Sequence, residues 1–144
     1  MRWYCPGCWR DFGEDLARCP HCGLDIHAFC DSKDFVDKLI VALNHPEPTT
    51  PVRAAYILGR LRDERAVARL IALVQQTGDV FIARAAVEAL GRIGTPAAHM
   101  FLRTLSTHPA QIVQEAARAA LTLAIDPVPA ASDRPLTKES DDET

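Results

Sequence analysis

Residues 82–93 read IARAAVEALGRI, and residues 54–61 read AAYILGRL, which repeats the later part of the first stretch 32 positions upstream. A third copy, VQEAARAAL, spans residues 113–121 and repeats the first nine residues of the opening stretch at an offset of 31. A period of this length, with two helices in each repeat, is typical of stacked helical repeats. The repetition therefore predicts a short α-solenoid rather than an ordinary bundle of six helices.

Helix boundaries are clearly marked between residues 32 and 125. The residues at predicted N-cap positions are Ser32, Thr50, Asp63, Asp79 and Thr95, and proline directly follows both threonines. The stretches between them carry apolar residues at helical spacing, as at Val67, Leu70 and Val74. We therefore expect six helices and no strand in this region, the last helix running from about residue 110 to 125.

The stretch at residues 82–93 resembles the short HEAT-like repeats of the phycobilisome-lyase type, whose motif reads roughly V-R-x-A-A-x-x-A-L-G-x-I. The resemblance covers about residues 34–125. It implies a mainly α fold in which HEAT-like helix pairs stack into a solenoid. Such repeats serve as binding scaffolds in many unrelated proteins, so the resemblance indicates the fold far more than the function. Phycobilin lyase activity is not expected from the repeats alone.

Four of the five cysteines form two C-x-x-C motifs, Cys5 with Cys8 and Cys19 with Cys22, separated by ten residues. The two-residue spacer lets both thiolates of a motif reach one tetrahedral ion, and two motifs complete four ligands. Four thiolates favour Zn²⁺ over Mg²⁺ or Ca²⁺ and leave no open coordination position. We therefore predict a structural Zn²⁺ ion, with iron in a rubredoxin-like site as the alternative metal.

Residues 3–26 resemble the small bacterial-type zinc ribbons written C-P-x-C…C-P-x-C-G. The resemblance implies a small β-hairpin module over residues 1–30. That family usually has glycine after its first motif, whereas Trp9 stands there in this chain, which implies a strained turn or a changed knuckle geometry. His27 and Cys30 are alternative ligands, although we expect Cys30 to be a small buried residue at the junction with the helices.

Both tryptophans, Trp3 and Trp9, exceed what is needed to pack around the metal motifs. We expect them to cover the exposed end of the first predicted helix at Phe35, Val36 and Leu39, because the end of a solenoid needs a cap. The alternative is an exposed aromatic contact surface.

The charge distribution separates the helical region from the residues that follow it. The chain has 16 Lys and Arg against 19 Asp and Glu, a net charge of −3, which argues against a nucleic-acid binder that uses the whole chain. Residues 127–144, here called the acidic tail, have too few apolar groups to offset the entropy cost of ordering, and we expect them to be disordered. The predicted domains are therefore a zinc ribbon at 1–30, a HEAT-like domain at 31–126 and the tail.

No apolar run approaches the roughly 18–20 residues of a membrane span, and the first residues lack the apolar core of a secretory signal. We therefore expect a cytoplasmic protein that has no contact with membranes. In a reducing compartment, clustered cysteines indicate a metal site before they indicate disulfides.

Motifs of catalysis are missing from the sequence, which has no nucleophile elbow, phosphate-binding loop or dinucleotide fingerprint. HEAT-like deoxyhypusine hydroxylases bind iron through His-Glu pairs, and none of the five histidines here is followed by glutamate. We therefore expect that the protein is not an enzyme and has no catalytic residue.

A basic face is predicted on the third and fifth helices, where Arg65, Arg69, His99 and Arg103 fall. In HEAT-like solenoids the second helix of each pair lines the concave face, so these residues form either a mildly basic groove or an ordinary solvated surface. A groove would accept an acidic protein segment, the acidic tail or, last in rank, nucleic acid. The sequence thus favours a zinc-binding adaptor that recognises another protein, with a nucleic-acid-associated factor as the alternative.

Overall fold

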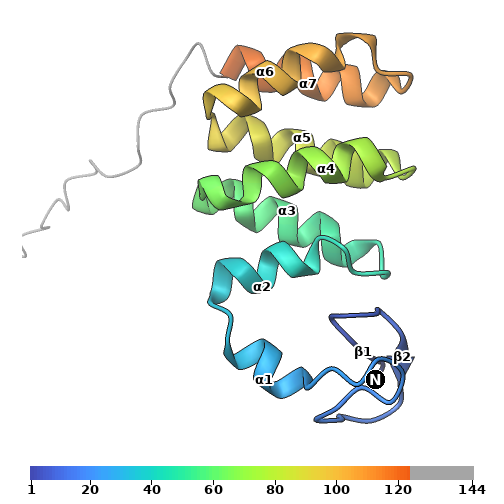
Figure 1. The fold of residues 1–144 in the computed structure, drawn as a ribbon. Coiled ribbons are helices and arrows are strands. Elements are labelled where there is room, and N and C mark those ends of the chain that lie inside the picture. The colour runs from blue at the N-terminus through green and yellow to red at the C-terminus, as the bar shows by residue number, and fades with distance from the viewer. Residues whose placement is uncertain (124–144) are drawn as a thin grey trace, which may run out of the picture.

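The computed structural model describes residues 1–123, in which two short strands precede a stack of helices (Figure 1). The N-terminal elements are β1 (Trp3–Tyr4), β2 (Asp11–Phe12) and α1 (Ile26–Asp31). The stack consists of α2 (Phe35–Ala42), α3 (Thr49–Leu61), α4 (Val67–Gln76), α5 (Val80–Ile93), α6 (Pro96–Thr104) and α7 (Gln111–Leu123). Two 3₁₀ turns, η1 (Glu64–Ala66) and η2 (Leu105–Thr107), precede α4 and follow α6.

Helix α5 is the centre of the stack, because it packs against α3 on one side, α7 on the other, and also against α4 and α6. Helices α2 and α3 form the pair next to the N-terminal module (Figure 1). Strands β1 and β2 pair antiparallel, with Trp3 opposite Phe12 and Tyr4 opposite Asp11. The predicted fold class is confirmed: the molecule is a mainly α solenoid of HEAT-like helix pairs with a small N-terminal β-hairpin.

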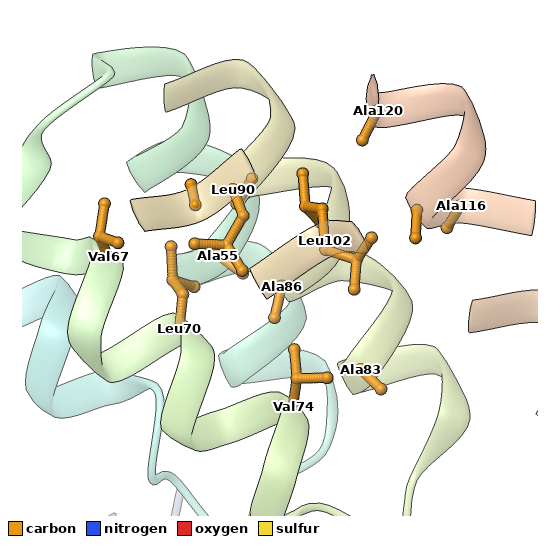
Figure 2. Packing of buried hydrophobic residues seen from close by; sticks show 14 of the residues in the cluster. Ala55, Val67, Leu70, Val74, Ala83, Ala86, Leu90, Leu102, Ala116 and Ala120 are labelled. Carbon is orange, nitrogen blue, oxygen red and sulfur yellow. The ribbon is translucent and has the colours of Figure 1, made fainter. Parts of the chain in front are cut away.

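The core of the stack is made of leucines separated by alanines. Leu58, Leu70 and Leu90 are fully buried. Figure 2 shows Leu70 and Val74 of α4 pointing into the same hydrophobic core as Leu90 of α5. Alanines on α3, α5 and α7 add little volume between the helices, so neighbouring repeats approach closely.

Neighbouring helices approach each other closely at the glycine of the repeated motif. A Cβ atom added to Gly59 of α3 would lie 2.8 Å from the Cα of Ala89 in α5. One added to Gly91 of α5 would lie 2.5 Å from the Cβ of Ala120 in α7. The repeated glycine therefore serves interhelical packing, whereas the chain turns later, at Gly94 with its φ of 70°.

The ends of the first two predicted helices differ from expectation. Helix α2 is capped by Asp34, which accepts a hydrogen bond from the Asp37 N–H, and not by Ser32. The Ser32 hydroxyl instead donates to the Phe29 carbonyl at the end of α1, a helix that the sequence analysis did not predict. Helix α3 begins at Thr49, one residue before the predicted cap Thr50, and has no side-chain cap.

The remaining predicted caps have their expected partners. Asp79 accepts from the N–H groups of the first turn of α5, and Thr95 accepts from the Ala98 N–H in α6. Asp63 caps η1, which leads directly into α4. The predicted acidic tail lies outside the described residues, as do residues 124–126 of the predicted helical domain. None of the helices in residues 1–123 combines the length and apolarity that crossing a membrane requires.

Candidate metal centre and solenoid groove

The two C-x-x-C motifs form turns with the same hydrogen-bond pattern. In the first turn the Trp9 N–H donates to the Cys5 carbonyl at 2.8 Å, and in the second the Gly23 N–H donates to the Cys19 carbonyl at 3.0 Å. Inside each turn a backbone N–H points at the first sulfur: Gly7 at Cys5 and His21 at Cys19, both at 3.4 Å. The two motifs thus present their thiols in equivalent ways.

The structure brings these four cysteines together, with all Sγ atoms within 4.8 Å of one another. The Cys5 and Cys22 sulfurs are 3.6 Å apart, and those of Cys8 and Cys19 are 3.7 Å apart. A tetrahedral ion with metal–sulfur bonds of about 2.3 Å separates its ligand sulfurs by about 3.8 Å. The spacing therefore fits one tetrahedral metal ion.

The pKa values of the clustered thiols also favour a bound cation. Burial would raise the pKa of Cys19, but the N–H groups of Cys22 and His21 and the neighbouring thiols lower it to about 6. The Leu24 N–H favours the thiolate of Cys22, yet burial and the other three cysteines raise its pKa to about 12. One thiolate forms readily and the last is strongly disfavoured, so four thiolates require a positive ion among them.

The alternative ligands lie apart from this cluster. The His27 Nε2 atom pairs with the Asp15 carboxylate at 3.4 Å, and both side chains are exposed. Cys30 lies half-buried in α1 and has no place among the four sulfurs. His21 points its ring at Arg10, with 3.3 Å between the Nδ1 and Nη1 atoms. Within residues 1–123 no other group of three or more potential ligands lies comparably close.

Trp9 has the backbone conformation that its position demands. Its φ is 58°, in the left-handed region, and Gly23 at the same place in the second turn has a φ of 76°. A bulky residue is strained there, and such strain persists only where the surroundings hold it. The centre of the His45 ring lies 5.4 Å from that of the Trp9 ring and 4.6 Å from that of the Tyr4 ring, and both contacts are edge-on.

This contact changes the expected role of the tryptophans. Trp9 lies against His45, in the loop between α2 and α3. Phe35, which we expected it to cover, remains 61% exposed, and Trp3 is 39% exposed. Tyr4 and Trp9 therefore connect the cysteine module to the solenoid through one histidine.

Replacing Trp9 with asparagine, which tolerates a left-handed backbone, is expected to keep the bound metal and to loosen this connection. Amide hydrogen exchange at residues 43–48 should become faster, because the loop loses an aromatic neighbour. Trp3→Phe is the matched control, since Trp3 makes no ring contact with His45. Unchanged exchange in the Trp9→Asn protein would show that the ring contact does not hold the loop.

A groove of about 1090 Å³ runs over α3, α5 and α7. Its floor includes the packing glycines Gly59 and Gly91. The polar residues that line it are Tyr56, Arg60, Arg62, Arg84, Glu88, Arg92, His99 and Glu115. The groove is thus formed mainly by α3, α5 and α7, and not by α4 and α6, on which we predicted a basic face.

The predicted basic face has a different organisation. Arg65 forms ion pairs with Asp34 at 2.9 Å, Asp63 at 3.1 Å and Asp37 at 3.4 Å. The Asp37 N–H and the Arg65 guanidinium lower the pKa of Asp34. Arg65 is therefore occupied in joining α2 to η1. Arg69 and Arg103 do not line the groove, and His99 alone of the predicted set does so.

Tyr56 and two arginines lie close together in the groove. Arg60 donates a 3.3 Å hydrogen bond to the Tyr56 hydroxyl, and the Arg92 guanidinium lies 5.1 Å from the centre of the Tyr56 ring. The hydrogen bond and the positive charge of Arg60 lower the pKa of Tyr56. Arg84 is neutralised by Glu88 at 2.8 Å, but no carboxylate of residues 1–123 pairs with Arg60, Arg62 or Arg92.

The sequence analysis missed these arginines, although a signal for them was present. Arg60 and Arg92 each follow the packing glycine of a repeat, 32 residues apart. Because the repeats stack in register, residues at equivalent positions come to lie on the same face. One further polar group lines the groove: the His99 Nε2 atom is buried and has no hydrogen-bond partner in the described part of the chain.

Comparison with known proteins agrees with this architecture. The family model described as HEAT repeats matches residues 36–122. The solved structure of human deoxyhypusine hydroxylase in complex with glycerol is similar at 27% sequence identity and a TM-score of 0.60, over 62% of this chain. The match spans about a third of the hydroxylase chain, 32%. No curated protein matches the sequence significantly.

The likeness to a hydroxylase corrects one prediction. We expected that the protein is not an enzyme, and this prediction is contradicted, because a chain of similar sequence and fold is one. We based the prediction on absent motifs, but the helical repeat carries catalytic and binding proteins alike. The repeats by themselves therefore exclude no catalytic role.

Proposed function

Since the chain belongs to the HEAT-repeat family, we propose that it is a zinc-binding scaffold that recognises another protein with the α3–α5–α7 groove. The observation that supports this most strongly is the groove itself, about 1090 Å³ in volume and bordered by Arg60, Arg62 and Arg92. Arginine is enriched where proteins recognise one another, and arginines without a carboxylate partner offer charge-assisted hydrogen bonds to a ligand.

The four cysteines hold a structural zinc ion in this proposal, and residues 1–30 form a zinc ribbon. In that module only the side chains of Cys5 and Cys19 are buried, so it has almost no apolar core of its own. A module of this size gains most of its folding free energy from the metal. Zinc supplies four strong bonds to sulfur at a closed site, which holds the two turns together.

The proposal extends to the finer classification of the chain. The stretch IARAAVEALGRI supports repeats of the phycobilisome-lyase type over a domain at residues 31–126. Thiols that serve as metal ligands persist in reducing compartments, which supports a place in the cytoplasm. A nucleic-acid ligand is the second candidate, favoured by the same arginines, but Tyr56 is the only Phe, Tyr or Trp among the described residues that line the groove.

The test is affinity purification of the chain, residues 1–144, followed by mass spectrometry and by binding measurements with the partner that is found. We expect the double variant Arg60→Glu/Arg92→Glu to lose at least about tenfold in affinity, because it turns two attractive charges into repulsive ones. Arg69→Glu/Arg103→Glu changes the same charge outside the groove and should bind as the native chain does. A partner that binds both variants equally, or retention of nucleic acid alone, would contradict the proposal.

A further inference from the structure

The three groove arginines that pair with no carboxylate of residues 1–123 lie at one edge of the solenoid. Gly59, near the end of α3, packs on Ala89, near the end of α5. Gly91, near the end of α5, packs in the same way on Ala120, near the end of α7. The three helices therefore run parallel, and their carboxyl ends share an edge.

Arg60 and Arg92 occupy the last turns of α3 and α5, and Arg62 is the C-cap of α3. All three arginines line the groove at that edge. Leu123, the last described residue of α7, lies at the same edge and also lines the groove. The chain thus leaves the described part of the structure beside a group of arginines that has no carboxylate partner within residues 1–123.

The residues that come next carry the complementary charge. The acidic residues of the acidic tail are Asp133, Glu139, Asp141, Asp142 and Glu143, against the basic residues Arg134 and Lys138. Because one residue spans up to about 3.3–3.6 Å of extended chain, the ten residues from Leu123 to Asp133 cover up to about 35 Å. The carboxylates are therefore within reach of the groove that Leu123 borders.

We propose that the acidic tail binds in the α3–α5–α7 groove of its own chain, with its carboxylates on Arg60, Arg62 and Arg92. The inference rests on the proposed function, because it names the chemistry of that groove: an acidic peptide segment. The covalent connection gives the tail an effective concentration on the order of mM, which compensates for the weakness of individual exposed ion pairs. An acidic partner then has to displace the tail, so the tail lowers the apparent affinity of the groove for that partner.

The test compares the native chain, residues 1–144, with a variant whose tail is neutral: Asp133→Asn, Glu139→Gln, Asp141→Asn, Asp142→Asn and Glu143→Gln. Nitrogen-15 NMR spectra report on the backbone amides of Gly59, Gly91 and Gly94 and on the side-chain Nε–H groups of Arg60 and Arg92. At low salt these signals should differ between the two chains. The difference should shrink several-fold at high salt, because exposed charges are screened. Gly13 and Gly78 do not line the groove and should not shift.

Groove signals that overlay for the two chains at low salt would overturn the proposal. A difference that grows with protein concentration would also overturn it, because the tail would then bind a second copy. Neither result bears on the proposed function, since the loss of a partner in the Arg60→Glu/Arg92→Glu chain is measured separately. The Arg60→Glu/Arg92→Glu chain is also compared with its native tail and with the neutral tail. If the tail binds in the groove, the groove signals of these two chains should be the same.

Discussion

Replacing Cys19 with serine is expected to lower the zinc content of the purified protein from about one ion per chain to nearly none. The Cys19 side chain is buried, its sulfur lies 3.7 Å from that of Cys8, and the His21 N–H points at it. A serine hydroxyl does not ionise near neutral pH and is a poor zinc ligand, so three thiolates are left around the ion. Elemental analysis of protein purified without added metal measures the change, and it also distinguishes zinc from iron.

Cys30→Ser is the matched control for this substitution, because Cys30 lies outside the sulfur cluster and should leave the zinc content unchanged. Far-ultraviolet circular dichroism of the Cys19→Ser chain should keep most of its helical signal, since no proposed ligand lies in the solenoid core. Full zinc in the Cys19→Ser protein would disprove the ligand assignment and direct attention to His27 and Cys30. Loss of the helical signal would show that the solenoid folds only with the cysteine module in place.

The repeated stretch at residues 82–93 predicted the architecture well, because each repeat position has one physical role. The leucine of the motif enters the core, and its glycine allows the next helix to approach, as Leu90 and Gly91 do. The cysteine spacing predicted the sulfur cluster for a similar reason: a two-residue spacer fixes the geometry of a turn. Trp9 in place of glycine predicted a strained turn, and its φ of 58° agrees with that expectation.

Features that depend on packing between elements were not predictable in the same way. Helical periodicity identifies the buried face of α3 and of α4. It does not tell which of the two helices borders the groove with its exposed face, because that depends on how successive repeats pack together. The choice of Asp34 over Ser32 as a cap depended on α1, a helix of six residues, too short to show periodicity. The contact between Trp9 and His45 joins residues 36 positions apart that no local pattern relates.

Replacing Gly91 with alanine is expected to destabilise the solenoid by about 1–3 kcal/mol, although alanine favours helix formation over glycine by about 1 kcal/mol at an unhindered site. The added Cβ atom would lie 2.5 Å from the Cβ of Ala120, closer than two carbon atoms can pack. Helices α5 and α7 must therefore move apart, and the buried neighbours Val87 and Val113 lose part of their packing. Thermal unfolding followed by circular dichroism should show a Tm lower by roughly 4–8 °C for each kcal/mol lost.

The packing explanation for Gly91 predicts the behaviour of three further substitutions. Gly59→Ala should be destabilising as well, because its Cβ would lie 2.8 Å from the Cα of Ala89. Gly78→Ala is the matched control and should change stability by less than about 0.5 kcal/mol, since its Cβ would meet nothing within 4 Å. Adding Ala120→Gly to the Gly91→Ala chain removes the nearest clashing atom and should restore part of the lost stability. A Gly91→Ala chain that is as stable as the native one would mean that the motif glycine is not needed for close packing of the repeats.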